Sequence, residues 1–349
     1  MATLVLTGEM LDMLPRTPAG RRARWALERL AAVCSGEAPP SVAELDEHYT
    51  SAWLAEVPMA WVFRENAPLM EAVNGIHQEP ARTNQITAVL DRVDGDAMRF
   101  RCAVEDTAPH RIKFQLISPA MPPSSFDDRT VRRDNRTVHV RDYGGDGPFL
   151  LLWHGAGGDA TIWEALIPSL RSFRVVAQDL PGHGGSPQRH VSVAETAADT
   201  RAVLDDLGVD RPIVVGHSMG GWIAVHYAAT TPCTALVCLD GPTNLDYTAM
   251  GITPDHPGWM PDPPDVRADL DSLDCPALIT LCRGASAAQE EWMVPFRSGL
   301  ADYLAEHHPE IRVAWQSTGH MNVLSAPQQT AELIAAFIQQ VGAERQQNA

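Results

Sequence analysis

The sequence is poor in positive charge, in cysteine and in long apolar runs, and each shortage excludes a class of protein. Its 349 residues hold 27 Lys and Arg against 44 Asp and Glu, a formal charge of −17. A nucleic acid or an anionic membrane would repel such a chain, so neither is an expected partner. No apolar run approaches the roughly 20 residues that cross a bilayer. The first residues also lack the pattern of a signal peptide, and we expect a cytoplasmic protein.

Cofactor motifs are missing as well. The six cysteines show no metal-ligand spacing, and no nucleotide or flavin motif is present. We therefore expect no metal and no other cofactor. Cys238 and Cys282 fall in predicted strands, where a reduced cysteine is a small buried apolar residue. The expected partner is a small molecule, and the sequence does not indicate an oligomeric state.

Helices dominate the beginning of the chain. Apolar residues at helical spacing predict a helix over residues 19–33. Ser41-Val42-Ala43-Glu44 is a capping box, which predicts a second helix that ends near Ala55. A third helix is expected within residues 58–73.

Alternation of apolar and polar residues then replaces the helical period. It predicts strands over residues 86–90, 100–104 and 112–116. Helices followed by antiparallel strands predict an α+β domain over residues 1–117, with the sheet wrapped around the helices, and a Pro- and Ser-rich linker over 118–126. This order resembles the cystatin-like N-terminal domain found ahead of some β-lactamase-like serine hydrolases of antibiotic gene clusters.

The most informative motif is Gly216-His217-Ser218-Met219-Gly220-Gly221. A β-branched run precedes it and an Ala-rich helical segment follows, so the serine lies at a sharp strand-to-helix turn where only small neighbours fit. Such a turn lifts the Ser218 hydroxyl clear of the sheet and directs the Met219 N–H toward a nearby oxyanion. Ser218 is therefore the predicted nucleophile.

The surrounding segments alternate between strand and helix, which predicts a mostly parallel sheet covered on both faces. Two further motifs are His154-Gly155 after one predicted strand and Asp179-Leu180-Pro181-Gly182-His183-Gly184-Gly185-Ser186 after the next. With the serine motif, they make residues from about 131 to 342 resemble the α/β-hydrolase superfamily. The resemblance implies an α/β-hydrolase domain over residues 127–349.

A serine needs a positioned base, and thirteen histidines compete for that role. His154 and His183 occupy loop positions that are structural in similar sequences, and His217 projects away from the nucleophile. His320 follows the last predicted strand, residues 312–316, where the hydrolase fold places its histidine. His320 is the predicted base, and the alternative is an ordinary loop histidine.

The acid departs from the family pattern. Most relatives place Asp shortly after the strand that here spans residues 277–282, but residues 283–288 contain no carboxylate. Asp240 ends the preceding strand, and a minority of the superfamily takes its acid from there. It would hold the histidine tautomer and stabilise the imidazolium. Glu290, Glu291 and a weak or missing acid remain alternatives.

The remaining site predictions concern the oxyanion and the substrate. The oxyanion hole is expected to combine the N–H of Met219 with that of Ala156 or Gly157. Residues 243–271 form a short, Pro-rich cap whose aromatic and Met side chains suit either an apolar pocket wall or the core. The predicted substrate-contacting residues are Trp222, Tyr247, Met250 and Trp259.

Three functions fit these residues. The first is a serine hydrolase that cleaves a carboxylic ester, lactone or thioester of a small apolar substrate through an acyl-enzyme on Ser218. The second is an acyl transferase, cyclase or lyase of natural-product biosynthesis that uses the same triad. The third is a non-catalytic binding protein on the hydrolase fold. The sequence does not identify the substrate.

Overall fold

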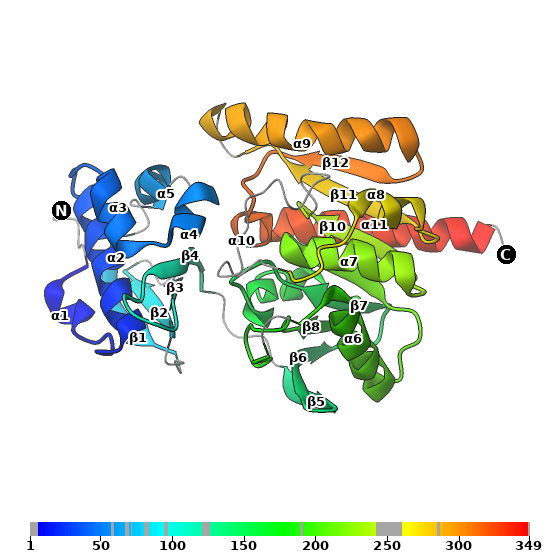
Figure 1. Ribbon diagram of the computed structural model, residues 1–349, viewed down its shortest axis with the longest axis horizontal. Coiled ribbons are helices and arrows are strands. Elements are labelled where there is room, and N and C mark those ends of the chain that lie inside the picture. The colour runs from blue at the N-terminus through cyan, green and yellow to red at the C-terminus, as the bar shows by residue number, and fades with distance from the viewer. Residues whose placement is uncertain are drawn as a thin grey trace. The chain divides into compact units, whose positions relative to one another are not determined.

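The computed structural model describes residues 6–56, 59–66, 70, 72–79, 84–93, 97–120, 126–188, 191–241, 260–284 and 287–347 (Figure 1). The chain divides into two compact units. One comprises residues 1–122 with 255–257, and the other comprises residues 123–254 with 258–349.

The first unit packs helices on one face of an antiparallel sheet, which in the described residues has four strands in the order β1-β2-β3-β4. The strands are β1 (Val73–Gln78), β2 (Gln85–Arg92), β3 (Ala97–Val104) and β4 (Ile112–Pro119). The helices are α1 (Gly8–Leu11), α2 (Pro18–Cys34), α3 (Val42–His48), α4 (Ser51–Glu56) and α5 (Met59–Asn66). Leu27 and Leu30 of α2 are fully buried in one cluster with Phe100 and Leu90 of the sheet. Strand β4 continues through Pro119, two residues into the segment predicted as linker.

The capping box is confirmed, but the helix that it starts is shorter than predicted. The Ser41 Oγ accepts from the Glu44 N–H, and the Glu44 carboxylate accepts from the Ser41 N–H. Helix α3 ends at His48 because Tyr49 has an extended backbone. The next residue, Thr50, donates its backbone N–H to the Ile112 carbonyl of β4. The buried Tyr49 hydroxyl also donates to Gln115 at 2.6 Å. These contacts with a distant strand break the predicted helix in two.

The second unit is built on a mixed sheet. Within the described ranges it has eight strands in the order β12-β11-β10-β9-β7-β8-β6-β5. These are β5 (Asp127–Arg133), β6 (Arg136–Gly144), β7 (Phe149–Trp153), β8 (Arg174–Gln178), β9 (Ile213–His217), β10 (Ala235–Leu239), β11 (Ala277–Cys282) and β12 (Arg312–Gln316). Strands β7 to β12 run parallel to one another, and at one edge β6 pairs antiparallel with both β8 and β5. Strands β9, β10 and β11 are buried along their whole length, as expected for a sheet covered on both faces.

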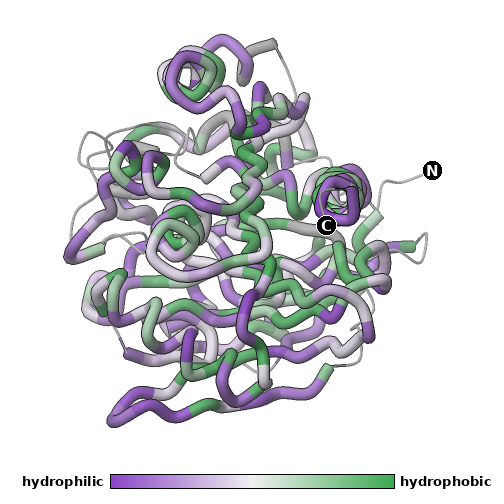
Figure 2. The backbone as a smooth tube through the Cα atoms, turned by 90° about the vertical axis from the view of Figure 1, so that its right-hand side faces the viewer, coloured by the Kyte–Doolittle hydropathy of each residue, from purple (hydrophilic) through white to green (hydrophobic). Residues whose placement is uncertain are grey.

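Helices cover this sheet on both sides. The helical segments are η2 (Ala160–Trp163), η3 (Ile167–Ser169), α6 (Val193–Leu207), α7 (Met219–Thr230), α8 (Val266–Asp271), α9 (Ala287–His307), α10 (Asn322–Ser325) and α11 (Pro327–Gln347). Helices α6, α7 and α8 lie in front of the sheet in Figure 1, and α11 lies behind it. Hydrophobic stretches of the backbone run through the interior, and hydrophilic ones follow the outer segments (Figure 2). No helix in the described part of the chain has the length and apolarity needed to cross a membrane.

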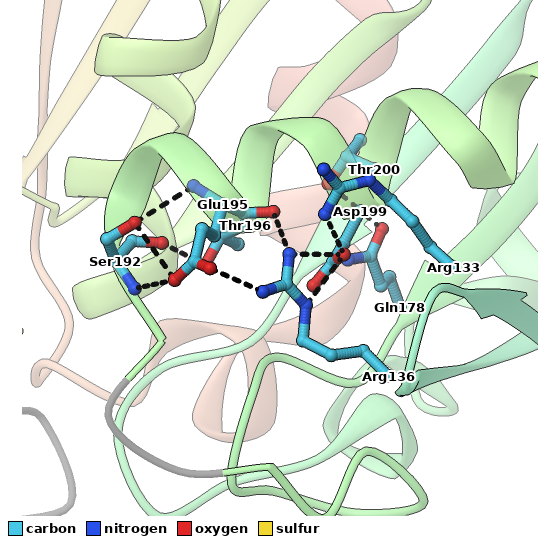
Figure 3. Close-up of polar contacts among 8 residues, drawn as sticks. All are labelled: Arg133, Arg136, Gln178, Ser192, Glu195, Thr196, Asp199 and Thr200. Carbon is cyan, nitrogen blue, oxygen red and sulfur yellow. Dashed lines mark hydrogen bonds and ion pairs between the residues drawn. The ribbon is translucent and has the colours of Figure 1, made fainter.

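A buried carboxylate fastens the edge hairpin to helix α6. The Asp199 Oδ1 accepts from the Arg133 guanidinium at 3.2 Å and from Arg136 at 2.9 and 3.1 Å (Figure 3). Arg136 also donates to the exposed Glu195 at 2.7 Å. Asp199 is buried, so its loss would leave two guanidinium groups without their shared counter-ion.

Replacing Asp199 with Asn should lower the free energy of unfolding by about 3 kcal/mol, because removing one partner of a buried ion pair leaves the other charge uncompensated. Urea unfolding followed by circular dichroism measures this loss. The matched control is Glu195→Gln, which removes the exposed partner of the same Arg136 and keeps the capping geometry of α6. Equal effects of the two substitutions would contradict the assignment.

The last part of the predicted cap, residues 260–271, is attached to α6 and α7. The Asp262 carboxylate accepts from the Val193 N–H at 2.8 Å, at the start of α6. The Asp269 carboxylate of α8 accepts from the His226 Nδ1 of α7 at 3.1 Å. The hydrogen bond that His226 donates to Asp269 raises the pKa of His226 and outweighs burial, which lowers it.

This raised pKa predicts a pH-dependent attachment of α8. The His226–Asp269 ion pair contributes fully below about pH 6.5, the ordinary histidine value, and its charge contribution is lost as the pH rises through the raised pKa. The melting temperature of the wild type should therefore exceed that of His226→Gln most at pH 5.5 to 6 and by less at pH 9. A difference that is constant or grows with pH would refute this. Asp269→Asn should show the same trend.

Candidate active site

Ser218 lies at a strained turn between β9 and α7. Its φ is 55° and its ψ is −123°, a left-handed backbone that residues other than glycine rarely adopt. The surrounding backbone holds this conformation. The Ser218 N–H donates to the Leu239 carbonyl at 3.1 Å, and its carbonyl accepts from the Gly221 N–H at 2.8 Å. The serine therefore stands at the corner that the motif predicts.

The three glycines around Ser218 have no room for a side chain. A Cβ on Gly216 would lie 2.2 Å from the Gly220 carbonyl oxygen, and one on Gly220 would lie 2.5 Å from a carbonyl oxygen at the end of β7. A Cβ on Gly221 would lie 2.6 Å from the Gly241 Cα. All of these obstacles include backbone atoms, which cannot swing aside as a flexible side chain can. The prediction that only small residues fit this turn is confirmed.

The structure brings Ser218, His320 and Asp240 together from distant parts of the chain. The His320 Nε2 lies 2.9 Å from the Ser218 Oγ, 102 residues away in sequence. The His320 Nδ1 lies 2.7 Å from the Asp240 Oδ2, 80 residues away. Since a carboxylate only accepts, Nδ1 carries the proton, and Nε2 is left to accept from the serine hydroxyl. His320 is in the loop after β12, as predicted.

Asp240 is fully buried directly after β10. Its Oδ1 accepts from the Cys282 N–H at 2.9 Å and from the Arg297 Nε at 2.6 Å, and its Oδ2 accepts from a second Arg297 nitrogen at 2.5 Å. Burial alone raises the pKa of Asp240, but the hydrogen bonds from Arg297 and His320 hold it well below its usual range. The carboxylate is thus ionised at neutral pH.

Comparison with known proteins relates the second unit to a known fold. A family model for the alpha/beta hydrolase fold matches residues 148–268. A solved structure, that of a candidate aryl esterase from Burkholderia cenocepacia, superposes with a TM-score of 0.50 at 18% identity and covers 62% of this chain and 100% of its own. The second unit therefore has the alpha/beta hydrolase fold, and we call it the hydrolase domain. At this identity the likeness to the solved structure shows the fold alone.

The sequence relatives of the hydrolase domain match a smaller part of the chain. Lipase LipV of Mycobacterium tuberculosis is 36% identical over 143 residues, 38% of this chain and 53% of LipV. Protein phosphatase methylesterase 1 of Bos taurus is 38% identical over 137 residues, 36% of each chain. An uncharacterised protein of Mycobacterium tuberculosis is 38% identical over 113 residues, 32% of each. The chain therefore spans between about a third and about half of the length of these relatives.

The alternative acids of the hydrolase domain lie elsewhere. Glu290 and Glu291 are exposed near the start of α9. Glu290 forms an ion pair with Arg283 at 3.5 Å. Within the described residues, neither glutamate has a hydrogen bond to His320, whereas Asp240 has one.

The oxyanion loop of the hydrolase domain passes directly against the serine, since a Cβ on Gly155 would lie 2.8 Å from the Ser218 Cβ. One of the predicted donors is already engaged, because the Gly157 N–H donates to the His183 Nε2 at 3.0 Å. Gly157 as an oxyanion donor is thus a correction to the sequence interpretation. The N–H groups of Met219 and Ala156 have no acceptor among the described residues, and they remain the candidate pair.

Each of the other candidate histidines of the hydrolase domain has a backbone partner. The His154 Nε2 accepts from the Leu180 N–H at 2.9 Å, and the His183 Nδ1 donates to the Pro181 carbonyl at 2.9 Å. These contacts hold the two glycine-containing loops together. Neither ring has a hydrogen bond to Ser218 within the described part of the chain.

His217 supports the base rather than replacing it. Its buried Nε2–H donates to the His320 carbonyl at 2.8 Å, and the two rings are 4.9 Å apart. Burial, followed by the charge of His320, lowers the pKa of His217 to about 3, so it is neutral. The sequence interpretation, in which His217 projects away from the serine, missed this support of the loop. Its position beside the nucleophile was the available signal.

Of the predicted substrate-contacting residues, the structure describes Trp222 alone. Trp222 is 2% exposed and belongs to the core cluster that also includes Met219 and Met260. Trp222 packs in the core in this structure, and its contact with the substrate stays a prediction. Tyr247, Met250 and Trp259 lie outside the described residues, as does most of the predicted cap.

Proposed function

We propose that the hydrolase domain is a serine esterase that cleaves a carboxylic ester, lactone or thioester of a small apolar substrate through an acyl-enzyme on Ser218. The observation that carries this proposal is the pair of hydrogen bonds that joins Asp240, His320 and Ser218 at the strained turn. Two of the relatives are a lipase and a methylesterase by name, which favours ester chemistry.

In the first half of the reaction, His320 activates the serine. As the Ser218 Oγ attacks the carbonyl carbon, its proton passes to the His320 Nε2, and the ionised Asp240 stabilises the imidazolium that forms. The oxyanion accepts hydrogen bonds from the N–H groups of Met219 and Ala156. His320 then returns the proton to the leaving alcohol oxygen or thiol sulfur, and the acyl group remains on Oγ.

In the second half, water replaces the alcohol. His320 takes a proton from water as the water oxygen attacks the acyl carbon, and the second oxyanion accepts hydrogen bonds from the same N–H groups. Collapse of this intermediate returns the proton to Oγ and releases the free acid. Each oxyanion donor of this kind typically contributes about 3 kcal/mol to lowering the barrier.

The experiment combines a fluorophosphonate probe with short- and medium-chain p-nitrophenyl esters. The wild type should be labelled once, at Ser218 as located by mass spectrometry, and should release the free acid. His320→Gln should be neither labelled nor active. Acyl transfer to an added alcohol in place of acid release would indicate the transferase alternative. Absence of both labelling and turnover would refute an enzymatic role and favour the binding protein.

A further inference from the structure

A buried arginine occupies the side of Asp240 that His320 leaves open. Arg297 lies in α9, is 3% exposed and meets the carboxylate with two nitrogens, Nε at 2.6 Å and Nη2 at 2.5 Å. Its remaining nitrogen donates to the Met293 carbonyl one helical turn earlier, at 3.2 Å. A triad acid needs only its histidine partner, so the ion pair requires an explanation of its own.

We propose that Arg297 is a positioning residue that orients Asp240 toward His320 and sets the pH range in which His320 accepts the proton of Ser218. This inference rests on the proposed serine esterase function. This proposal gives helix α9 a role in the chemistry. Neither the sequence motifs nor the related proteins indicate that role.

The first part of the argument is geometric. Each oxygen of Asp240 accepts two hydrogen bonds: Oδ1 from Cys282 and Arg297, and Oδ2 from His320 and Arg297. The guanidinium fork is planar and fixes the plane of a carboxylate that it meets with two nitrogens. Rotation of the carboxylate would break both arms of the fork. Arg297 thereby fixes the direction from which Oδ2 faces the His320 Nδ1.

The second part concerns charge. Arg297 already balances the charge of Asp240, so a proton on the partly exposed His320 gives these three groups a net positive charge. Besides this pair, the titratable groups of neighbouring strands that interact electrostatically with Asp240 or His320 in the described ranges are His217, Cys282 and Cys238. Burial raises the pKa of the Cys238 thiol, so this group is neutral. His217 is neutral because burial lowers its pKa to about 3, and burial raises the pKa of the Cys282 thiol, so it too is neutral. Removing the charge of Arg297 should therefore favour protonated His320.

The test compares Arg297→Gln, which loses the charge but keeps an N–H donor, with Arg297→Lys, which keeps the charge but loses the fork. The titration of the His320 imidazole is followed by NMR and identified by the signal that disappears in His320→Gln. We expect the midpoint to rise by about one pH unit in Arg297→Gln and to stay near the wild-type value in Arg297→Lys. Arg297→Met, of similar length, supplies the neutral side chain if Arg297→Gln does not fold.

Kinetics give the second readout. The pH at which kcat/KM is half-maximal should rise with the NMR midpoint in Arg297→Gln. Arg297→Lys should keep that pH but lose about tenfold in plateau kcat, because an ammonium does not fix the carboxylate plane. An unchanged midpoint in both neutral variants would overturn the proposal and leave Arg297 as a structural ion pair. A shifted midpoint in a protein without Ser218-dependent turnover would support the electrostatic part and refute the esterase instead.

Discussion

Replacing Ser218 with alanine should lower kcat for p-nitrophenyl esters by about 10⁶-fold, the largest effect expected from any single substitution in this chain. In the proposed mechanism, His320 deprotonates the Ser218 hydroxyl and its oxygen carries the acyl group, so the loss of this hydroxyl removes the covalent route. Only the oxyanion donors and substrate binding then remain. Initial rates and the absence of an acyl-enzyme in mass spectra measure the effect.

The control for this substitution is Ser272→Ala, at an exposed serine after α8, which should keep the wild-type kcat. Alanine and serine both carry a Cβ, so the left-handed backbone at position 218 is equally strained with either residue. The fold should therefore be retained. A Ser218→Ala protein with more than about 1% of the wild-type rate would be incompatible with the covalent mechanism.

Replacing Asp240 with asparagine should lower kcat by about 10³- to 10⁴-fold. The amide nitrogen would face donors on both sides, from His320 and from Arg297, and the tautomer that leaves Nε2 free to accept would lose its support. The same substitution leaves the buried Arg297 guanidinium without its counter-ion, so stability should fall as well. Rates and urea unfolding measured on the same preparation separate the two effects.

The matched controls for Asp240→Asn are Glu290→Gln and Glu291→Gln. Both glutamates are exposed and make no hydrogen bond to His320 within the described residues, so kcat should change little. A large loss in either control, with Asp240→Asn active, would transfer the acid role to α9.

The parts of this site that lie within one short segment could be predicted from sequence. The Ser218 turn depends on its own strand, helix and glycines, and His320 follows directly from its place after β12. Asp240 required the further observation that no carboxylate follows β11. Arg297, 57 residues from its partner, carried no local signal, because only the packing of α9 against the sheet brings it to the carboxylate.

Long-range contacts explain the other differences. The predicted second helix breaks at Tyr49 because that residue bridges to β4, and a helical pattern in sequence does not record such a partner. Similarly, Ala156 and Gly157 are equivalent in a tight turn until His183, 26 residues later, accepts from one of them. Local periodicity predicted where the elements are, and their distant partners set the details.

The placement of Asp240 also determines which part of the proposed catalytic centre is able to move. Strands β9 and β10 are paired along their full lengths, from Ile213 opposite Ala235 to His217 opposite Leu239, so the residues that follow them form one rigid block. Of the three residues, only His320 lies on a loop. This loop is held by the hydrogen bond from the His217 Nε2–H to the His320 carbonyl. Displacement of that loop should therefore break the hydrogen bonds of His320 while leaving Ser218 and Asp240 in place.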